Sequence, residues 1–305
     1  MWTTKEMPDQ KGKTVIVTGA NAGIGYETAK ALYQSGALVI LACRDSSKAQ
    51  ITMDVLKNEG GSGTLEIGIL NLEDRNSIKT FAEQFIEQHD RLDILINNAG
   101  IMLPPLGHTP DGFEQQFGVN FIGHFALTGY LYPLLKTTNG SRIVNVSSMA
   151  YLHGTIDFDN LKSEKDYDAT REYSQSKLAN VLFALELQRR IDAKGDQVLS
   201  LVAQPGANKT ELARHMSEES FQSALERVGE LMEPWQGALP SLYAATMQDV
   251  KTGVIYSPDQ DGGYRGYPAA FPLTPNALDE YVALRLFNLA SQVTGIQFPG
   301  SMMAS

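Results

Sequence analysis

A tyrosine and a lysine stand four residues apart in the segment Tyr173-Ser174-Gln175-Ser176-Lys177. On a helix this spacing places the phenol and the ammonium on one face. A tyrosine side chain has an ordinary pKa of about 10, and a fixed cation nearby favours the phenolate and lowers that pKa. A phenol adjusted in this way can donate and accept a proton at a carbonyl or alcohol oxygen.

Two other pairs have the same spacing, Tyr26 with Lys30 and Tyr132 with Lys136. The first pair opens the helix expected after a glycine-rich turn, and the second closes the helix expected to end near residue 136. We expect packing or surface roles for both. The spacing alone therefore does not identify a site, and the surrounding sequence has to decide.

Three polar features distinguish the surroundings of Tyr173. An expected strand ends in Asn145-Val146-Ser147-Ser148, so two hydroxyls follow its carboxyl end, where a substrate meets a parallel sheet. Another ends in Asn97-Asn98-Ala99-Gly100, a small polar turn that suits close approach of a cofactor. Asn120 lies within an apolar helical run, and a buried amide needs partners such as a water or a backbone carbonyl near the lysine.

A glycine-rich turn between the first expected strand and helix predicts the cofactor class. The turn reads Thr18-Gly19-Ala20-Asn21-Ala22-Gly23-Ile24-Gly25. Glycines permit a tight turn, and the following helix N-terminus offers N–H groups to a pyrophosphate. We therefore expect a nicotinamide dinucleotide here, contacted by Gly19, Asn21, Gly23, Ile24 and Gly25.

The end of the second expected strand favours NADP over NAD. Cys43 is neutral, Arg44 follows it, and Lys48 lies one helical turn further on. Cations suit the 2′-phosphate of NADP, whereas NAD prefers an acidic residue that binds the ribose hydroxyls. We interpret Asp45 as an N-cap of the next helix. If Asp45 bound the ribose instead, the preference would reverse.

The elements that would position these residues alternate along the chain. Buried strand-like runs are expected at 14–18, 38–42, 64–69, 93–96, 142–146 and 198–203, and helices at 24–34, 47–58, 75–88, 112–136 and 172–194. Such alternation predicts an α/β fold with a doubly wound parallel sheet of the Rossmann type. A helix at 237–247, a strand at 253–257, a loop at 259–275 and a final helix at 277–293 follow. We expect one domain over residues 1–305.

With these motifs in this order, the chain resembles a short-chain dehydrogenase/reductase over nearly its whole length. The resemblance implies that Ser148 orients the substrate oxygen, Tyr173 exchanges its proton, and Lys177 lowers the tyrosine pKa. Asn120 would anchor a water in the proton relay. Ser148 is preferred over Ser147 because the second serine usually holds this role in the family. The implied cofactor contacts beyond the glycine turn are Arg44, Lys48, Asn71, Leu72, Asn98, Ala99, Gly100, Tyr173, Lys177, Pro205, Gly206 and Thr210.

The finer resemblance is to the retinol dehydrogenase-like branch. It rests on residues 42–45, 119–125 and 142–148, and on the long gap between Ser148 and Tyr173, which makes 151–170 resemble an insertion beside the site. Asn71 replaces a common aspartate near the adenine. Asn208 replaces a common valine that contacts the nicotinamide carboxamide in the family. The N-terminal membrane anchor of several such enzymes is expected to be absent.

Composition excludes several other classes of function. The net charge of −10 and the pI of about 5.0 argue against nucleic-acid and anionic-membrane surfaces. With Cys43 as the single cysteine, no internal disulfide forms, and no apolar run reaches membrane length, so a cytoplasmic location is expected. The scattered histidines predict no metal site, and no G-x-S-x-G motif suggests a serine hydrolase.

The sequence thus predicts an NADP(H)-dependent oxidoreductase that moves hydride to or from a small-molecule carbonyl or alcohol of lipophilic character. Residues 207–236 carry Met, Leu, Phe and Trp side chains and form a predicted substrate lid, although such residues also suit a core. The alternative is a non-catalytic NADP-binding sensor or scaffold on the same fold. A homo-oligomer through the helices at 112–136 and 172–194 is possible, but their apolar content also suits an internal core.

Overall fold

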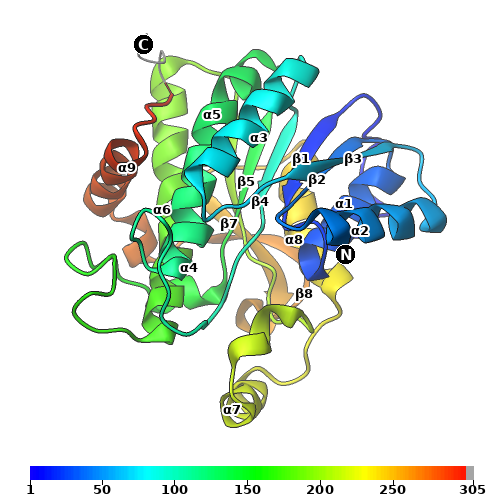
Figure 1. The fold of residues 1–305 in the computed structure, drawn as a ribbon. Coiled ribbons are helices and arrows are strands. Elements are labelled where there is room, and N and C mark those ends of the chain that lie inside the picture. Colours follow the sequence, from blue (N-terminus) through cyan, green and yellow to red (C-terminus); the bar gives the residue numbers. More distant parts are fainter. Residues whose placement is uncertain (300–305) are drawn as a thin grey trace.

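An eight-stranded sheet runs through the middle of the computed structural model, which describes residues 1–299 (Figure 1). Residues 300–305 of the predicted domain lie outside the described residues. The spatial order is β3-β2-β1-β4-β5-β6-β7-β8, parallel except for the last pair. The strands are β1 (Thr14–Thr18), β2 (Leu38–Cys43), β3 (Thr64–Ile69), β4 (Ile94–Asn97), β5 (Arg142–Val146), β6 (Leu199–Ala203), β7 (Val254–Gln260) and β8 (Arg265–Pro272).

The strand order creates the crevice that this fold uses for ligands. Strand β1 pairs with β2 on one side and with β4 on the other, so the chain reverses its direction of winding beside β1. All five residues of β1 and all four of β4 are buried, which explains their continuous apolar sequences. Ligands bind at the carboxyl ends of strands at such a reversal. The predicted doubly wound Rossmann-type fold is confirmed.

Helices cover both faces of the sheet and separate two apolar cores. The α-helices of more than one turn are α1 (Gly23–Gln34), α2 (Ser46–Glu59), α3 (Arg75–Gln88), α5 (His124–Thr137), α6 (Ala169–Lys194), α7 (Glu218–Val228), α8 (Pro234–Thr246) and α9 (Glu280–Thr294). Most begin or end within three residues of the predicted bounds. One core joins the strands to α1, α2 and α8, and the other joins them to α3, α5 and α6.

The helix predicted at 112–136 is confirmed as one helical run over 115–137, but part of that run is not α-helical. A short α4 (Gln115–Phe117) leads into a π-helical segment, η1 (Gly118–Gly123), before α5 begins at His124. A π turn takes five residues to close a hydrogen bond and rotates the side chains that follow. The apolar periodicity does not encode this bulge, which contains Asn120.

The segment 259–275, predicted as a loop, contains a strand, so this prediction was wrong. Strand β8 pairs antiparallel with β7, with a register shift between Pro258 and Gln260. Pro268 and Pro272 disfavour a central strand, but β8 lies at the sheet edge, where a missing N–H costs little. Proline was therefore a misleading signal in this segment.

The last helix packs along α6, and the chain then returns over α5. Phe125, Phe183 and Phe287 cluster with Phe298, with ring centroids of Phe125 and Phe287 4.9 Å apart. Apolar side chains of α5 and α6 thus pack in an internal core, which was the alternative to an oligomer interface for these helices. The oligomer stays a prediction. Within residues 1–299, no helix combines the length and the apolar character needed to cross a membrane.

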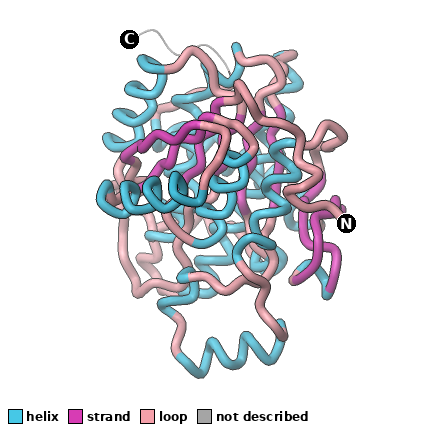
Figure 2. The backbone as a smooth tube through the Cα atoms, turned by 90° about the vertical axis from the view of Figure 1, so that its right-hand side faces the viewer, coloured by secondary structure: helices cyan, strands magenta, loops and turns pink. Residues whose placement is uncertain are grey.

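The segment predicted as a lid stands apart from these layers. Its parts are the short η3 (Glu211–His215) and α7, and α7 has no buried residue. Figures 1 and 2 both show α7 below the body of the molecule. Of the apolar residues that suggested a lid, Met232 is buried at 4% exposure, whereas Trp235 is 43% exposed. Most of this segment is therefore not core.

A buried carboxylate ties the amino ends of β1 and β4 together. Asp93 is 2% exposed and accepts hydrogen bonds from Lys13, Arg91 and the Thr14 backbone N–H, between 2.7 and 3.0 Å. Burial alone would raise its pKa, but the hydrogen bonds from Arg91, Thr14 and Lys13 outweigh burial and hold the pKa of Asp93 below its ordinary value.

We expect Asp93→Asn to lower the free energy of unfolding by about 2 kcal/mol at pH 7, because charge-assisted hydrogen bonds are lost while the half-exposed cations remain solvated. A group with a lowered folded pKa stabilises above its unfolded pKa of about 4. The difference from wild type should therefore shrink as the pH falls below about 4 in urea-unfolding curves. The exposed neighbour variant Asp90→Asn is the control, and equal effects of the two variants would contradict the assignment.

Candidate active site

The glycine-rich turn after β1 forms a cradle open to a ligand. Gly19 and Gly23 have φ values of +67° and +54°, in the left-handed region that favours glycine. A Cβ at Gly25 would lie 2.3 Å from the Gly19 carbonyl oxygen, so no side chain fits there. Ala22, the N-cap of α1, has no side-chain cap, and the first turn holds no acidic residue. The N–H groups of α1 are thus available to a pyrophosphate.

The end of β2 is followed by exposed cations and by Asp45, a carboxylate that already accepts hydrogen bonds from the backbone. Asp45 accepts hydrogen bonds from the backbone N–H groups of Ser47 and Lys48, which confirms it as the N-cap of α2. Arg44 is exposed, and its Nη1 lies 3.4 Å from Glu73 Oε1. Burial raises the pKa of the Cys43 thiol to about 11, so this group stays neutral.

The turns after β3 and β4 line the same side of the cradle. Asn71 accepts a hydrogen bond from the Glu73 N–H and so stabilises its own turn. The carbonyl of Leu72 contacts Gly123, where a Cβ would lie 2.4 Å from it. Asn98 donates from its side chain to the Thr18 carbonyl at 2.8 Å, which joins the β4 turn to the glycine turn. The structure thus gathers these predicted cofactor residues around one crevice.

Tyr173, Ser148 and Lys177 meet at the carboxyl end of β5. Tyr173 is 6% exposed, and the Ser148 hydroxyl lies near enough to act on the pKa of its phenol. The Ser147 hydroxyl points elsewhere and donates to the Lys177 carbonyl at 2.8 Å. Lys177 is also buried, and its Nζ lies 5.7 Å from the centre of the Tyr173 ring and 3.3 Å from the Val146 carbonyl oxygen. The spacing on α6 does place phenol and ammonium together.

In each of the two other tyrosine–lysine pairs, both side chains bind one carboxylate. Tyr26 and Lys30 both bind the carboxylate of Glu59, at 3.0 and 2.7 Å. Tyr132 and Lys136 both bind the carboxylate of Asp196, at 2.8 and 2.9 Å. In each case burial and the carboxylate raise the pKa of the phenol, so it stays protonated.

At the third pair, no carboxylate within residues 1–299 pairs with Lys177. Burial lowers the pKa of Lys177 to about 8, so the ammonium is largely present at neutral pH without a counter-ion. Burial raises the pKa of Tyr173 to about 12, against the effect of the Ser148 hydrogen bond. The expected lowering of the Tyr173 pKa by Lys177 therefore stays a prediction.

Asn120 reaches the site from the π-helical segment. Its side-chain oxygen accepts from the Ile101 N–H at 2.9 Å, and its amide donates to the Ile101 carbonyl and the Ser176 hydroxyl. The buried amide thus has the partners that it needs, and one of them is the backbone carbonyl of Ile101, next to the Gly100 that lies beside Lys177. A Cβ at Gly100 would lie 3.2 Å from Asn120 Oδ1 and 3.4 Å from Lys177 Nζ. Gly100 therefore lies between the asparagine and the lysine.

The segment 151–170 braces the loop that follows β4. Tyr167 donates to the Pro104 carbonyl at 2.6 Å, and Gln116 accepts from the Leu103 N–H at 2.9 Å. Gln175 on α6 accepts from the Asp157 N–H at 2.6 Å. The segment that resembles an insertion thus connects the start of α6, near Tyr173, to the loop beyond Gly100.

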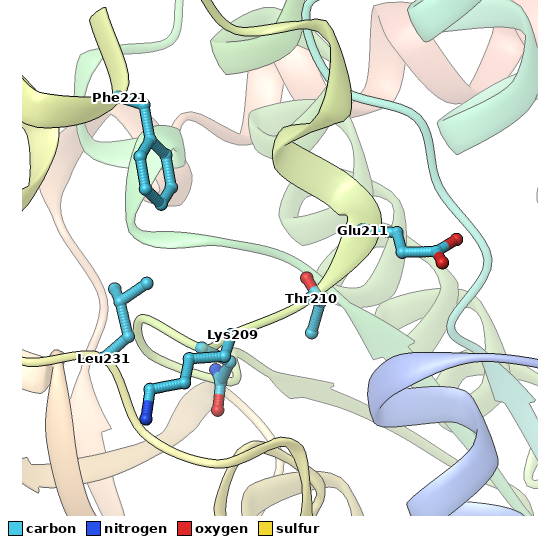
Figure 3. Close-up of a pocket in the computed structure, with 6 residues that line it drawn as sticks. Lys209, Thr210, Glu211, Phe221 and Leu231 are labelled. Atoms are coloured by element: carbon cyan, nitrogen blue, oxygen red, sulfur yellow. The ribbon is translucent and has the colours of Figure 1, made fainter. Parts of the chain in front are cut away.

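The start of the predicted lid closes the cradle from the other side. Gly206 has a φ of +71°, and the Thr210 methyl carbon would lie 3.2 Å from a Cβ at Gly23. Asn208 donates to the Pro205 carbonyl at 2.7 Å, which keeps its side chain at the base of the lid. A cavity of about 380 Å³ opens here, with Phe221 and Leu231 on the side opposite Thr210 (Figure 3).

Three residues outside our predicted site also hold it together. The Thr18 hydroxyl accepts from the N–H groups of Asn98 and Ala99, both at 2.9 Å. Asn180 donates to the Val146 carbonyl beside Lys177, and Gln204 accepts from the Gly206 N–H. The sequence held a signal for Asn180, because it lies one helical turn beyond Lys177 on the same face. Nothing in the spacing distinguishes Gln204.

Comparisons with known proteins agree with this arrangement. A family model described as short chain dehydrogenase matches residues 13–220. Retinol dehydrogenase 14 of Mus musculus is 40% identical over 298 residues, covering 93% of this chain and 86% of that protein. Retinol dehydrogenase 13 of Homo sapiens is 41% identical over 296 residues, covering 94% and 86%.

Solved structures give the same result for the fold. A crystal structure of an uncharacterized protein from Mycobacterium paratuberculosis has a TM-score of 0.82 and 37% identity, with 98% of this chain and 99% of that chain covered. The RhlG/NADP active-site complex of Pseudomonas aeruginosa has a TM-score of 0.60 and 24% identity, with 77% and 90% covered. The second likeness bears on the fold alone.

Proposed function

This chain belongs to the short chain dehydrogenase family, in its retinol dehydrogenase-like branch, and we propose that it is an NADP(H)-dependent oxidoreductase of lipophilic carbonyls or alcohols. Hydride transfer at an alcohol or carbonyl carbon follows from the family. The observation that carries the catalytic assignment is the buried ammonium of Lys177, without a carboxylate, beside the buried phenol of Tyr173. The cofactor and the substrate class are the finer parts of the proposal.

The reaction needs a proton at the substrate oxygen, and the site supplies it through hydroxyl groups. Ser148 holds the substrate oxygen next to Tyr173 and stabilises the charge that develops there. Tyr173 donates its proton to that oxygen in reduction and accepts it in oxidation. Lys177 stabilises the phenolate that remains after donation, because no carboxylate in the described part of the chain cancels its charge. A bound nicotinamide would supply or accept the hydride at the substrate carbon.

Two observations support NADP(H) as the cofactor. Asp45 is engaged as a helix cap through its Oδ1, so it is less suited to bind the ribose hydroxyls that NAD presents. Arg44 and Lys48 are exposed beside the glycine turn, where a 2′-phosphate would add charge-assisted contacts. Arg44 would have to turn partly away from Glu73, whose carboxylate also accepts from Gln115 at 2.9 Å.

The lid supports a lipophilic substrate. Phe221, Leu225 and Val228 recur at helical spacing on α7 yet are not buried in the protein, and Phe221 lines the cavity at the base of the lid. An apolar substrate would supply the partner that this face lacks. The relatives named above are retinol dehydrogenases, which suits that class. The cytoplasmic location expected from the sequence stays a prediction.

We expect Tyr173→Phe to reduce turnover by a factor of about 10² to 10⁴, the usual contribution of a positioned proton donor. The assay follows NADPH oxidation with a panel of retinaldehyde, medium-chain aldehydes and ketones. Tyr26→Phe is the matched control. It removes the phenol hydroxyl of a tyrosine with the same spacing to a lysine, but this tyrosine and its lysine both bind the carboxylate of Glu59. NADPH binding without turnover of any substrate in the wild type would instead support the sensor or scaffold alternative.

We expect Arg44→Ala to raise the apparent KM for NADP(H) about tenfold and to change that for NAD(H) little, because one charge-assisted contact to the 2′-phosphate is lost. Steady-state kinetics with both cofactors at a fixed substrate concentration measure this. Arg75→Ala, which removes an arginine bound to Asp111, is a control outside the cofactor residues. The assignment fails if NAD(H) is the better cofactor of both the wild type and Arg44→Ala.

A further inference from the structure

His124 is a fully enclosed imidazole between the glycine turn and the π-helical segment. It is 2% exposed, its Nε2 lies 2.9 Å from the Thr18 hydroxyl oxygen, and its Nδ1 lies 3.0 Å from the Asn120 carbonyl oxygen. The proposed mechanism does not use it. The structure shows it packed, with both ring nitrogens engaged.

The chemistry of its partners fixes the tautomer. A carbonyl oxygen only accepts hydrogen bonds, so Nδ1 carries the proton that goes to Asn120. Nε2 of a neutral ring is then an acceptor, and the Thr18 hydroxyl donates to it in preference to the more distant Ile96 carbonyl at 3.3 Å. Burial lowers the pKa of His124 to about 4, with a smaller contribution from the Lys177 charge, so the ring stays neutral at neutral pH.

The π bulge explains why a side chain is needed at this point. The His124 backbone N–H goes to the Phe121 carbonyl, not to the carbonyl of Asn120 four residues back. The ring of the same residue binds the Asn120 carbonyl instead. The segment whose geometry carries the Asn120 side chain to Ile101 is thus held by His124 Nδ1.

The other ring nitrogen acts on the cofactor crevice. The Thr18 hydroxyl accepts from the N–H groups of Asn98 and Ala99 and donates to His124 Nε2. Its three hydrogen bonds join the end of β1, the turn after β4 and the start of α5. Gly19 follows Thr18 directly, so a shift of this hydroxyl moves the glycine turn as well.

We infer that His124 is a positioning residue that aligns the dinucleotide-binding turns through Nε2 and, through Nδ1, Asn120, to which the family resemblance assigns a place in the proton relay. This inference rests on the proposed function, since it assigns the two nitrogens to the binding and the turnover of that reaction. Both nitrogens are engaged by protein groups, so His124 acts through these residues. Loss of one nitrogen should therefore affect one kinetic parameter more than the other, which loss of packing alone would not do.

Two amide substitutions separate the two nitrogens. The amide nitrogen of His124→Asn occupies the place of Nδ1 and keeps the bond to Asn120, but it cannot reach Thr18. The amide oxygen of His124→Gln reaches the place of Nε2 and accepts from Thr18, but the donor to Asn120 is lost. We expect His124→Asn to weaken NADPH binding about fivefold with kcat little changed, and His124→Gln to lower kcat about fivefold with the Kd for NADPH little changed.

The Kd is measured by NADPH fluorescence titration, and kcat at saturating NADPH with the aldehyde that wild type reduces fastest. Tyr132→Phe, at the other end of α5, controls for general loss of packing, and thermal melting ranks all variants. If both amide variants change Kd and kcat together, or neither changes them, the inference is wrong while the proposed function stands. If the wild type itself does not bind NADPH, the proposed function is wrong, and the inference that rests on it is wrong with it.

Discussion

A buried ammonium that has no counter-ion among residues 1–299 is the constraint on which this site depends. Removing a charge from water is costly, and proteins usually pair such a charge with a carboxylate. The Lys177 ammonium instead lies beside the Val146 carbonyl, the Tyr173 ring and Gly100. Its charge is therefore available to whatever anion forms nearby. The Glu59 and Asp196 carboxylates at the other two tyrosine–lysine pairs show how that availability would be lost.

The rest of the fold keeps this arrangement in place. Strand β5 delivers Ser148 and the Val146 carbonyl, α6 delivers Tyr173 and Lys177, and the π-helical segment delivers Asn120 to one edge of the sheet. The glycine turn and the start of α1, which has no side-chain cap, lie beside them. Far from this edge, Asp93 fixes the amino ends of β1 and β4, so the crevice between these strands has a rigid base.

Much of this could be predicted from the sequence, because buried parallel strands and amphipathic helices have distinct periods. The glycine turn, the Asp45 cap and the helix that carries Tyr173 and Lys177 could also be predicted, because each depends on residues that are close in sequence. The π bulge at Asn120 could not be predicted, since one extra residue per turn leaves an apolar run apolar. Strand β8 was hidden by its prolines. The role of Thr18 depends on a turn 80 residues away, and no local pattern reports such a contact.

The pH dependence of kcat/KM tests the central claim most directly, because this parameter reports ionisations of the free enzyme. Burial lowers the pKa of Lys177 to about 8, so the cation that stabilises the phenolate is lost as the pH rises through that value. The account predicts that wild-type kcat/KM falls above about pH 8, and that Lys177→Arg, whose guanidinium stays charged, is slower but lacks this decline. A wild-type profile that stays flat to pH 10, or the same decline in Lys177→Arg, would contradict it.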